Sequence, residues 1–191
     1  TDSDGIFSTK GIAKVTLPSS LEFIGDFAFS RNSLTSVIIP NSVTSLGSHT
    51  FFDNSLTNVI ISNNMTLIGR HAFRYNKLTS VVIPNSVISI GSSAFAENKL
   101  SSITIPNSVT TINDHAFYAN DLTNIVLETN SNIRLIGEYA FFGWPSVLSS
   151  ITLPENTNTG FIEYKDSNGN SYSPGELITD FTISYYSNIE E

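Results

Sequence analysis

The segment Leu34-Thr-Ser-Val-Ile-Ile-Pro40 decides the fold of this chain, because it returns at a fixed interval of 22 residues. Its clearest copies span residues 56–62, 78–84, 100–106 and 122–128. An earlier copy begins at Ile12, and a final copy begins at Leu148, where insertions displace it by four residues. A constant interval of about 20 to 50 residues is typical of a solenoid, in which each copy forms one coil and packs on its neighbours. The sequence therefore predicts a repeat solenoid.

Each copy contains the pattern of a short strand with one buried face. Leu34, Val37 and Ile39 are expected to point inward, while the residues between them are polar or β-branched. Val43 and Leu46, with their counterparts in later copies, are expected to fill the core from the opposite wall. One copy thus predicts one coil with two walls around an apolar centre.

Three further columns of the repeat are conserved in chemistry from copy to copy along the chain. A glycine column admits only Asn as a substitute, which predicts a left-handed backbone position: Gly25, Gly47, Gly69, Gly91, Asn113 and Gly137. A phenylalanine column predicts a ladder of stacked rings inside the solenoid: Phe29, Phe51, Phe73, Phe95, Phe117 and Phe141. An asparagine column is expected to hydrogen-bond the backbone of the following coil: Asn32, Asn54, Asn76, Asn98 and Asn120.

The combined pattern L-T-S-V-x-I-P-N-S-V-T-x-I-G-x-x-A-F-x-x-N resembles the BspA-like leucine-rich repeat family of bacterial and protist surface proteins. The resemblance covers Ile12 to Pro154. It implies a right-handed coil with a parallel β-sheet on the concave face and short strands or 3₁₀ turns on the convex face. Members of this family are typically secreted or attached to the cell surface, and several resemble adhesins. The family has no shared catalytic residues that could be assigned to this chain.

Composition excludes several classes of function. The chain has no cysteine, which excludes disulfides, thiolate metal sites and a cysteine nucleophile. The net charge of −8 argues against nucleic acid and anionic membranes as partners. No apolar run is long enough to cross a bilayer, so membrane insertion is not expected. Most of the charge lies in residues 155–191, which carry −6, whereas residues 1–154 carry −2.

The outward side chains of the repeated strand form the first candidate binding surface. Equivalent residues of successive coils lie about 4.8 Å apart, so each position becomes a straight stripe. The two stripes form an uncharged face that we call the strand face: Ser36, Ile38, Asn58, Ile60, Ser80, Val82, Ser102, Thr104, Asn124 and Val126. An exposed apolar stripe is typical of an interaction surface. The alternative is that Val and Ile are present only because they favour strands.

The variable loop after the phenylalanine column is the second candidate surface. Phe52, Tyr75, Tyr118 and Trp144 are predicted to form an aromatic ridge that contacts a protein or a sugar. The alternative is that these rings fold back over the edges of the coils.

All three histidines fall in one column of the repeat. His49 and His71 lie on adjacent coils, so a shared metal ion is conceivable, but no column of carboxylates completes a site. The column also accepts Phe27 and Tyr139, which favours a packing role, so no metal and no cofactor are expected. The sequence contains no constellation of catalytic residues, and we expect that the protein is not an enzyme.

These observations predict three segments: an amino-terminal lead-in over residues 1–11, a solenoid of about six to seven coils over 12–154, and a β-rich cap over 155–191. Asn168-Gly169 predicts a β-hairpin inside the cap. The expected function is that of a secreted or cell-surface module, of bacterial origin, that mediates adhesion or protein–protein interaction. The alternatives are a structural spacer or self-associating stalk and, third, a carbohydrate-binding module. The partner is expected to be a protein or host surface component, with a glycan as the alternative, and a monomer is favoured.

Overall fold

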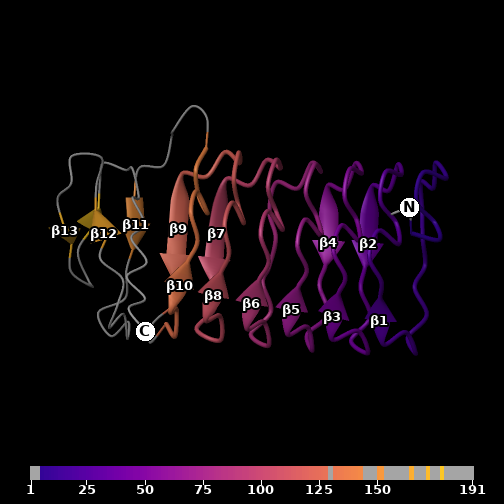
Figure 1. Ribbon diagram of the computed structural model, residues 1–191, viewed down its shortest axis with the longest axis horizontal. Coiled ribbons are helices and arrows are strands. Elements are labelled where there is room, and N and C mark those ends of the chain that lie inside the picture. The colour runs from indigo at the N-terminus through magenta and orange to yellow at the C-terminus, as the bar shows by residue number, and fades with distance from the viewer. Residues whose placement is uncertain are drawn as a thin grey trace.

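The computed structural model describes residues 5–128 and 131–143, together with the backbone of short strands at 150–152, 164–165, 171–172 and 177–178. Successive coils are stacked in a row, in the order in which they occur in the sequence (Figure 1). The described residues contain strands and turns and no helix. The chain is therefore a parallel β-solenoid in which each 22-residue copy forms one coil, as the repeat predicts.

The first wall is built from the strands that the repeated motif predicts. They run parallel and in register, so that Ser36 pairs with Asn58 and Ile38 pairs with Ile60. The strands of this wall are β2 (Ser36–Ile38), β4 (Asn58–Ile60), β7 (Ser102–Ile105), β9 (Asn124–Leu127) and β11 (Ser150–Thr152). β2, β4, β7 and β9 bury their inward side chains, such as Val37 and Ile103, in the core.

The first wall is interrupted at the copy that spans residues 78–84. β2 pairs only with β4, and β7, β9 and β11 belong to a separate sheet. Residues 79–83 form no strand, and their main-chain groups make no hydrogen bond in the structure. Figure 1 shows the resulting gap between β4 and β7. Because the motif at 78–84 matches the other copies, the sequence offers no explanation for this interruption.

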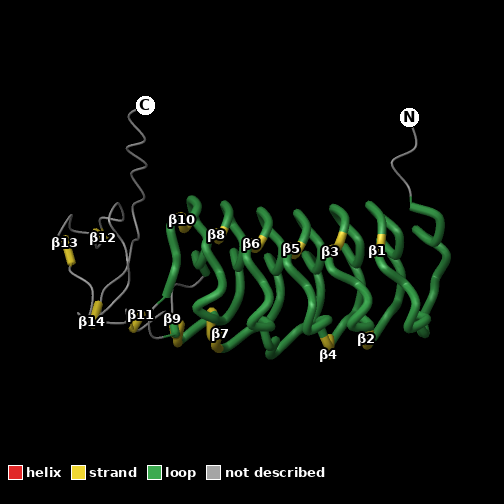
Figure 2. Tube along the Cα trace, turned by 90° about the horizontal axis from the view of Figure 1, so that it is seen from below, coloured by secondary structure: helices red, strands yellow, loops and turns green. Residues whose placement is uncertain are grey.

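The second wall is a continuous six-stranded parallel sheet of two-residue strands on the other side of the coils (Figure 2). Its strands are β1 (Phe23–Ile24), β3 (Ser45–Leu46), β5 (Leu67–Ile68), β6 (Ser89–Ile90), β8 (Thr111–Ile112) and β10 (Leu135–Ile136). The second residue of each strand is buried, and Ile68, Ile90 and Ile112 are completely inaccessible. The prediction that Leu46 and its counterparts fill the core from this side is confirmed.

A ladder of stacked phenylalanines runs through the core, as the sequence predicts. Neighbouring rings from Phe29 to Phe141 lie 5.3–5.6 Å apart between centroids and are nearly parallel. The ladder begins one coil earlier than the strand motif indicates, because Phe7 stacks on Phe29 at 5.3 Å. The Phe7 amide also donates to the Ala28 carbonyl at 3.1 Å. Residues of the segment predicted as a lead-in therefore repeat the turn of the later coils.

The asparagine ladder joins adjacent coils, but in the direction opposite to the predicted one. Asn76 Oδ1 accepts a hydrogen bond from the Leu56 amide at 2.9 Å. Asn76 Nδ2 donates to the carbonyls of Phe51 and Phe73 at 3.0 and 3.1 Å. Phe51 belongs to the preceding coil, whereas Leu56 and Phe73 belong to the same copy as Asn76, so this amide group satisfies backbone groups of both coils. The expectation of contacts to the following coil is wrong.

The glycine column disfavours side chains for a reason that differs from the predicted left-handed backbone. None of its members has a positive φ; the left-handed conformation belongs to two other columns, represented by His71 (φ 55°) and Tyr75 (φ 56°). A Cβ at Gly69 would overlap the carbonyl oxygen of Leu46, and a Cβ at Gly91 would lie 2.7 Å from the Arg70 amide nitrogen. At Gly69 and Gly91 glycine is therefore required because the neighbouring coil lies too close for a side chain. The predicted left-handed backbone is wrong for the column.

The carboxyl-terminal strands include two antiparallel pairs. β12 (Tyr164–Lys165) pairs with β13 (Ser171–Tyr172), which agrees with the predicted hairpin around Asn168-Gly169. β14 (Leu177–Ile178) pairs with β11 and thus extends the first wall with an antiparallel strand. The hairpin turn itself, residues 166–170, lies outside the described residues. The predicted division into residues 1–11, 12–154 and 155–191 stays a prediction.

Candidate functional site

The strand face lies on the outer side of the first wall, and its orientation is the predicted one. Nine of the ten residues are exposed, and Val126 is half-buried. The exposed fractions of Ile38, Ile60 and Val82 are 65%, 52% and 82%, although these are apolar side chains. Register pairs join equivalent residues of adjacent strands, such as Thr104 and Val126, so the stripes are straight. A role of this face in binding stays a prediction.

The chemistry of the strand face is uniform. One stripe carries hydroxyl and amide groups, and the neighbouring stripe carries β-branched side chains, with no ionisable group among the ten residues. The column beside them is also exposed and carries hydroxyls, as at Thr35, Thr57 and Thr79. Burying this surface against a partner would remove apolar area from water without the cost of desolvating a charge. Such a face suits an uncharged partner surface.

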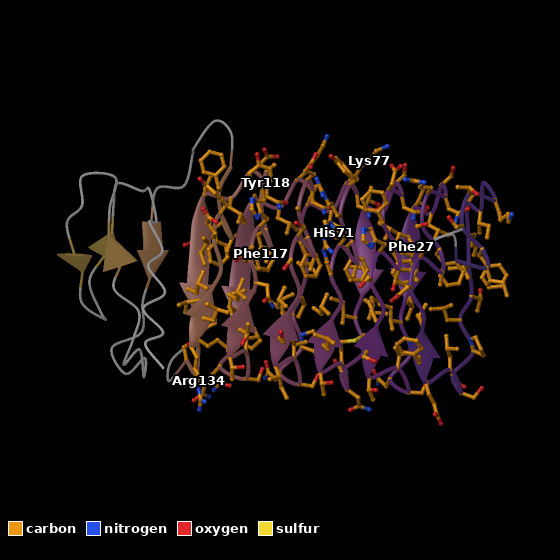
Figure 3. All side chains as sticks on the ribbon, in the orientation of Figure 1. Phe27, His71, Lys77, Phe117, Tyr118 and Arg134 are labelled. Carbon is orange, nitrogen blue, oxygen red and sulfur yellow. The ribbon has the colours of Figure 1, made fainter. Side chains whose placement is uncertain are left out.

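Phe52 and Tyr118, two members of the predicted aromatic ridge, pack against their own neighbours. The Phe52 ring meets His49 edge to face at 5.3 Å and Tyr75 at 5.6 Å. Tyr118 stacks on Phe142 at 5.8 Å and is half-buried (Figure 3). The alternative in which the rings fold back over the coil edges therefore describes both residues. Trp144 lies outside the described residues.

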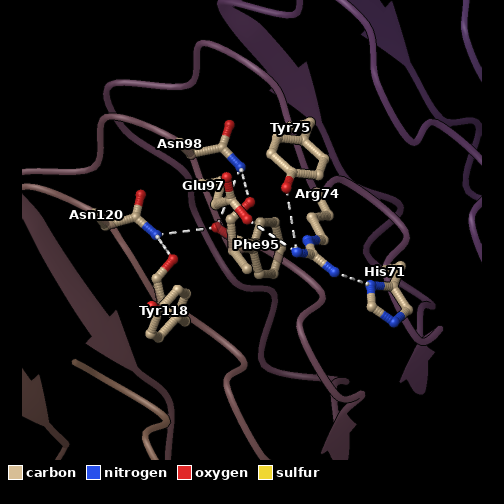
Figure 4. A network of polar contacts seen from close by, with 9 residues as sticks. His71, Arg74, Tyr75, Phe95, Glu97, Asn98, Tyr118 and Asn120 are labelled. Carbon is tan, nitrogen blue, oxygen red and sulfur yellow. Dashed lines mark hydrogen bonds and ion pairs between the residues drawn. The ribbon is translucent and has the colours of Figure 1, made fainter. Parts of the chain in front are cut away.

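Tyr75 is the described member of the ridge that remains exposed, at 42% of its surface. The guanidinium carbon of Arg74 lies 4.7 Å from the centroid of its ring. Figure 4 shows Arg74 between Tyr75, Glu97 and His71. Because Arg74 occupies one side of the ring, Tyr75 offers less stacking surface than a free aromatic platform.

Two exposed aromatic residues were not among the predicted binding residues. Tyr139 and Phe142 are both exposed and meet edge to face at 5.7 Å. Tyr139 occupies the histidine column and Phe142 occupies the column of Phe52 and Tyr118. The column positions alone give no signal for this exposure, because the counterparts His71 and Ala96 are buried.

The histidine column is a stack of planar rings. His49 lies 4.4 Å from Phe27 and 4.5 Å from His71 between ring centroids, and both contacts are nearly parallel. His115 packs in the same manner, though tilted, against Tyr139 at 5.3 Å. The packing role that the sequence predicts for this column is confirmed by these contacts.

Polar contacts and burial keep the two stacked imidazoles neutral. Arg74 Nη1 lies 3.3 Å from His71 Nδ1, and Arg74 Nη2 donates to Glu97 Oε1 at 2.8 Å. Burial lowers the pKa of His71 to about 4, and the positive charges of His49, Arg70 and Arg74 act in the same direction. Burial, followed by Arg70 and Arg74, also lowers the pKa of His49. Cationic neighbours of this kind disfavour a bound metal cation.

The part of the chain that the structure describes contains neither a metal-binding cluster nor a membrane-spanning helix. No group of three or more His, Cys, Asp or Glu side chains in the described ranges could hold a metal ion. Among the same residues, no helix has the length and apolar character needed to span a membrane. The strand face and the turn aromatics are therefore the surfaces on which a functional argument can rest.

The described architecture matches a known family model. Six copies of the BspA type leucine-rich repeat region match residues 3–123 and 66–165. The chain belongs to the BspA-type leucine-rich-repeat family. The match reaches beyond the segment from Ile12 to Pro154 on both sides, which agrees with the additional turn formed around Phe7.

Two solved structures are similar to this BspA-type chain. A leucine-rich repeat protein from Bacteroides ovatus is 27% identical, with a TM-score of 0.56, over 71% of this chain and 42% of its own. A leucine rich cell surface protein from Faecalibacterium prausnitzii is 29% identical, with a TM-score of 0.54, over 84% of this chain and 52% of its own. The present chain thus spans about half the length of these proteins. No protein of curated function matches it.

The family and these relatives point to a repeat-based surface protein. The BspA-type leucine-rich repeat is typically not catalytic. Family membership does not identify a partner, so the binding surface has to be argued from the residues of this chain.

Proposed function

We propose that this BspA-type chain is a secreted or cell-surface binding module that mediates protein–protein interaction or adhesion through its strand face. The observation that carries the proposal is the line of exposed Ile38, Ile60 and Val82 on an uncharged wall. The family and the similarity to a cell surface protein of Faecalibacterium prausnitzii support the location.

The energetics of the strand face favour association. Burying the exposed part of one Ile or Val side chain contributes about 1–2 kcal/mol, so three such residues supply several kcal/mol in one contact. The flanking hydroxyls and amides can form hydrogen bonds at the rim, where water also reaches them. No ionisable group of the strand face has to be desolvated. The surface therefore supports binding to a neutral partner surface.

The turn aromatics support a secondary contact beside the strand face. Tyr75 is exposed but partly covered by Arg74, and Phe52 and Tyr118 are engaged in packing within the solenoid. A carbohydrate module normally offers free ring faces for stacking, and these residues offer few. The observations favour a protein surface over a glycan as the partner.

A pair of charge substitutions tests the proposal. Ile60→Lys combined with Val82→Glu places charges in the centre of the strand face at exposed positions, so the fold should persist. Leu67→Lys combined with Ile88→Glu is the matched control, because these residues are similarly exposed on the second wall, at 43% and 49%. The readout is adhesion of protein-coated beads to immobilised extracellular proteins and to beads coated with the chain itself. Adhesion should fall at least tenfold for the first pair and persist for the control; equal adhesion by both would overturn the proposal.

A further inference from the structure

The strand face has properties that identify its partner, provided that the proposed binding function holds. We infer that the partner is a second copy of this chain, packed strand face against strand face about a two-fold axis that passes beside Val82. Val82 is the central residue of the apolar stripe, with two coils before it and two after it. It is also the most exposed large apolar residue of the described chain.

The absence of charge is the first argument for a second copy. A two-fold axis brings one surface onto itself, so a charged residue near the axis meets a charge of the same sign. The whole chain carries a net charge of −8, of which −6 lies in residues 155–191, so repulsion opposes contacts between two copies that include this segment. The strand face contains no ionisable residue over five consecutive coils. It is therefore suited to contact with its own copy.

The spacing of the stripes is the second argument. Rows of side chains repeat about every 4.8 Å along the solenoid, and two sheets pack face to face at about 10 Å. A second copy has the same interval, so all five rows of one face meet rows of the other. An extended peptide lying along the solenoid repeats about every 6.6 Å on one side and falls out of step with the rows. A partner with the same repeat makes the larger number of equivalent contacts.

The order of the coils is expected to be reversed between the two copies. In that arrangement Val82 meets Val82, Ile60 meets Thr104, and Ile38 meets Val126, so the β-branched stripe lies on itself. If the coils of both copies ran in the same order, the two carboxyl-terminal ends would come together. Residues 155–191 of each copy carry seven acids and one lysine. Repulsion between these like charges favours the reversed order.

The area of the face predicts a weak dimer. The strand face is five coils long, roughly 25 Å, and about five strand residues wide, roughly 15 Å. Its area is therefore on the order of 400 Å² per copy. Stable interfaces bury about 800 Å² per partner, so the isolated chain should be mostly monomeric in dilute solution. Many copies on one surface raise the local concentration, and several weak contacts then act together. The inferred pairing is therefore effective between crowded surfaces.

Single cysteine variants test this geometry, because the natural chain has no thiol that could react. Facing sheets lie too far apart for a direct disulfide at most positions, so a short bismaleimide is used at high protein concentration. Val82→Cys alone should give a covalent dimer, and Ile60→Cys mixed with Thr104→Cys should give a mixed dimer. Ile38→Cys alone should react at least tenfold more slowly, and Ile88→Cys on the second wall provides the background rate. Circular dichroism verifies that each variant is folded.

The outcomes separate this inference from the proposed function. Crosslinking of Ile38→Cys as fast as Val82→Cys would contradict the reversed order, and no crosslinking above the Ile88→Cys background would overturn self-pairing. If crosslinking is absent while the strand-face variant still loses adhesion to extracellular proteins, the binding function stands and its partner is a different protein. If the strand-face variant also adheres normally, both the inference and the function are wrong.

Discussion

His49 and His71 stack on adjacent coils with their ring centroids 4.5 Å apart, and each adopts a positive φ. In addition to burial, the pKa of His49 is shifted by the charges of Asp26, Arg31, Arg70 and Arg74. Burial and, after it, Arg70 and Arg74 also lower the pKa of His71. Protonation of both rings would place two positive charges in contact beside these arginines. Acid is therefore expected to destabilise the solenoid at this stack.

Acidification should destabilise the protein through this stack. The pKa of His71 is about 4 in the folded chain and 6.5 when the residue is free, so the unfolded chain binds protons first as the pH falls. The contribution is present above pH 6.5 and is lost between about pH 6.5 and 4, at a cost of about 2 kcal/mol after allowance for partial solvent screening. Urea unfolding at several pH values measures this effect. His49→Phe with His71→Phe keeps the stack, since Phe27 occupies the same column, and should remove part of the dependence; an unchanged pH profile would contradict the assignment.

The asparagine ladder should contribute strongly to stability. Asn76→Ala removes the hydrogen bonds to the Leu56 amide and to the carbonyls of Phe51 and Phe73, all of which are buried. The Leu56 amide is then left without an acceptor, and the Phe51 and Phe73 carbonyls each keep one donor, from Asn54 and Asn98. This loss should cost about 2–4 kcal/mol. Asn85→Ala at an exposed turn is the control and should change stability by less than about 0.5 kcal/mol. Chemical denaturation compares both variants, and equal effects would argue against a structural role of the ladder.

Two substitutions distinguish close approach of coils from left-handed backbone. Gly69→Ala places a Cβ against the Leu46 carbonyl and should destabilise the fold by at least about 2 kcal/mol. Ala119→Gly relieves a positive φ of 54° and should stabilise it by about 1 kcal/mol. Thermal unfolding of both variants gives the sign of each effect. A stabilising Gly69→Ala would show that the neighbouring coil does not contact this position.

The interruption of the first wall should be visible in hydrogen exchange. The amides of Ser80, Val81 and Val82 make no hydrogen bond, whereas those of β7 and β9 belong to a paired sheet. Amides without hydrogen bonds exchange through small local openings. We expect residues 80–82 to exchange at least tenfold faster than residues 103–105, as measured by NMR. Equal protection would mean that the wall is continuous in solution.

The sequence was informative about which residues of the 22-residue repeat are buried and which are exposed. The coil order, the buried Phe73 and Ile68, and the exposed Ile60 follow from the period, because one column has one environment along the stack. The role of Gly69 was mistaken because a missing side chain shows that a Cβ is disfavoured without showing which atom excludes it. The direction of the Asn76 contacts was mistaken because the spacing is the same toward either neighbouring coil.

The exposure of the candidate site residues could be predicted only in part, because it depends on contacts that do not repeat every 22 residues. The outward orientation of Val82 follows from strand alternation, whereas its exposed fraction of 82%, greater than the 65% of Ile38 and the 52% of Ile60, does not follow from the repeat. The exposure of Tyr75 depends on the packing of Arg74 and Phe52, which differ from the residues at equivalent positions in other copies. Contacts between unique residues are not encoded in the period.

Adhesion by the two charge-pair variants is the most direct test of the claim that the strand face binds a partner. Beads coated with the natural chain, with Ile60→Lys/Val82→Glu, or with Leu67→Lys/Ile88→Glu are compared at equal coating density after each protein has been shown to be folded. The strand-face variant should lose at least nine-tenths of the adhesion, and the second-wall variant should retain it. Full adhesion by the strand-face variant would contradict the account.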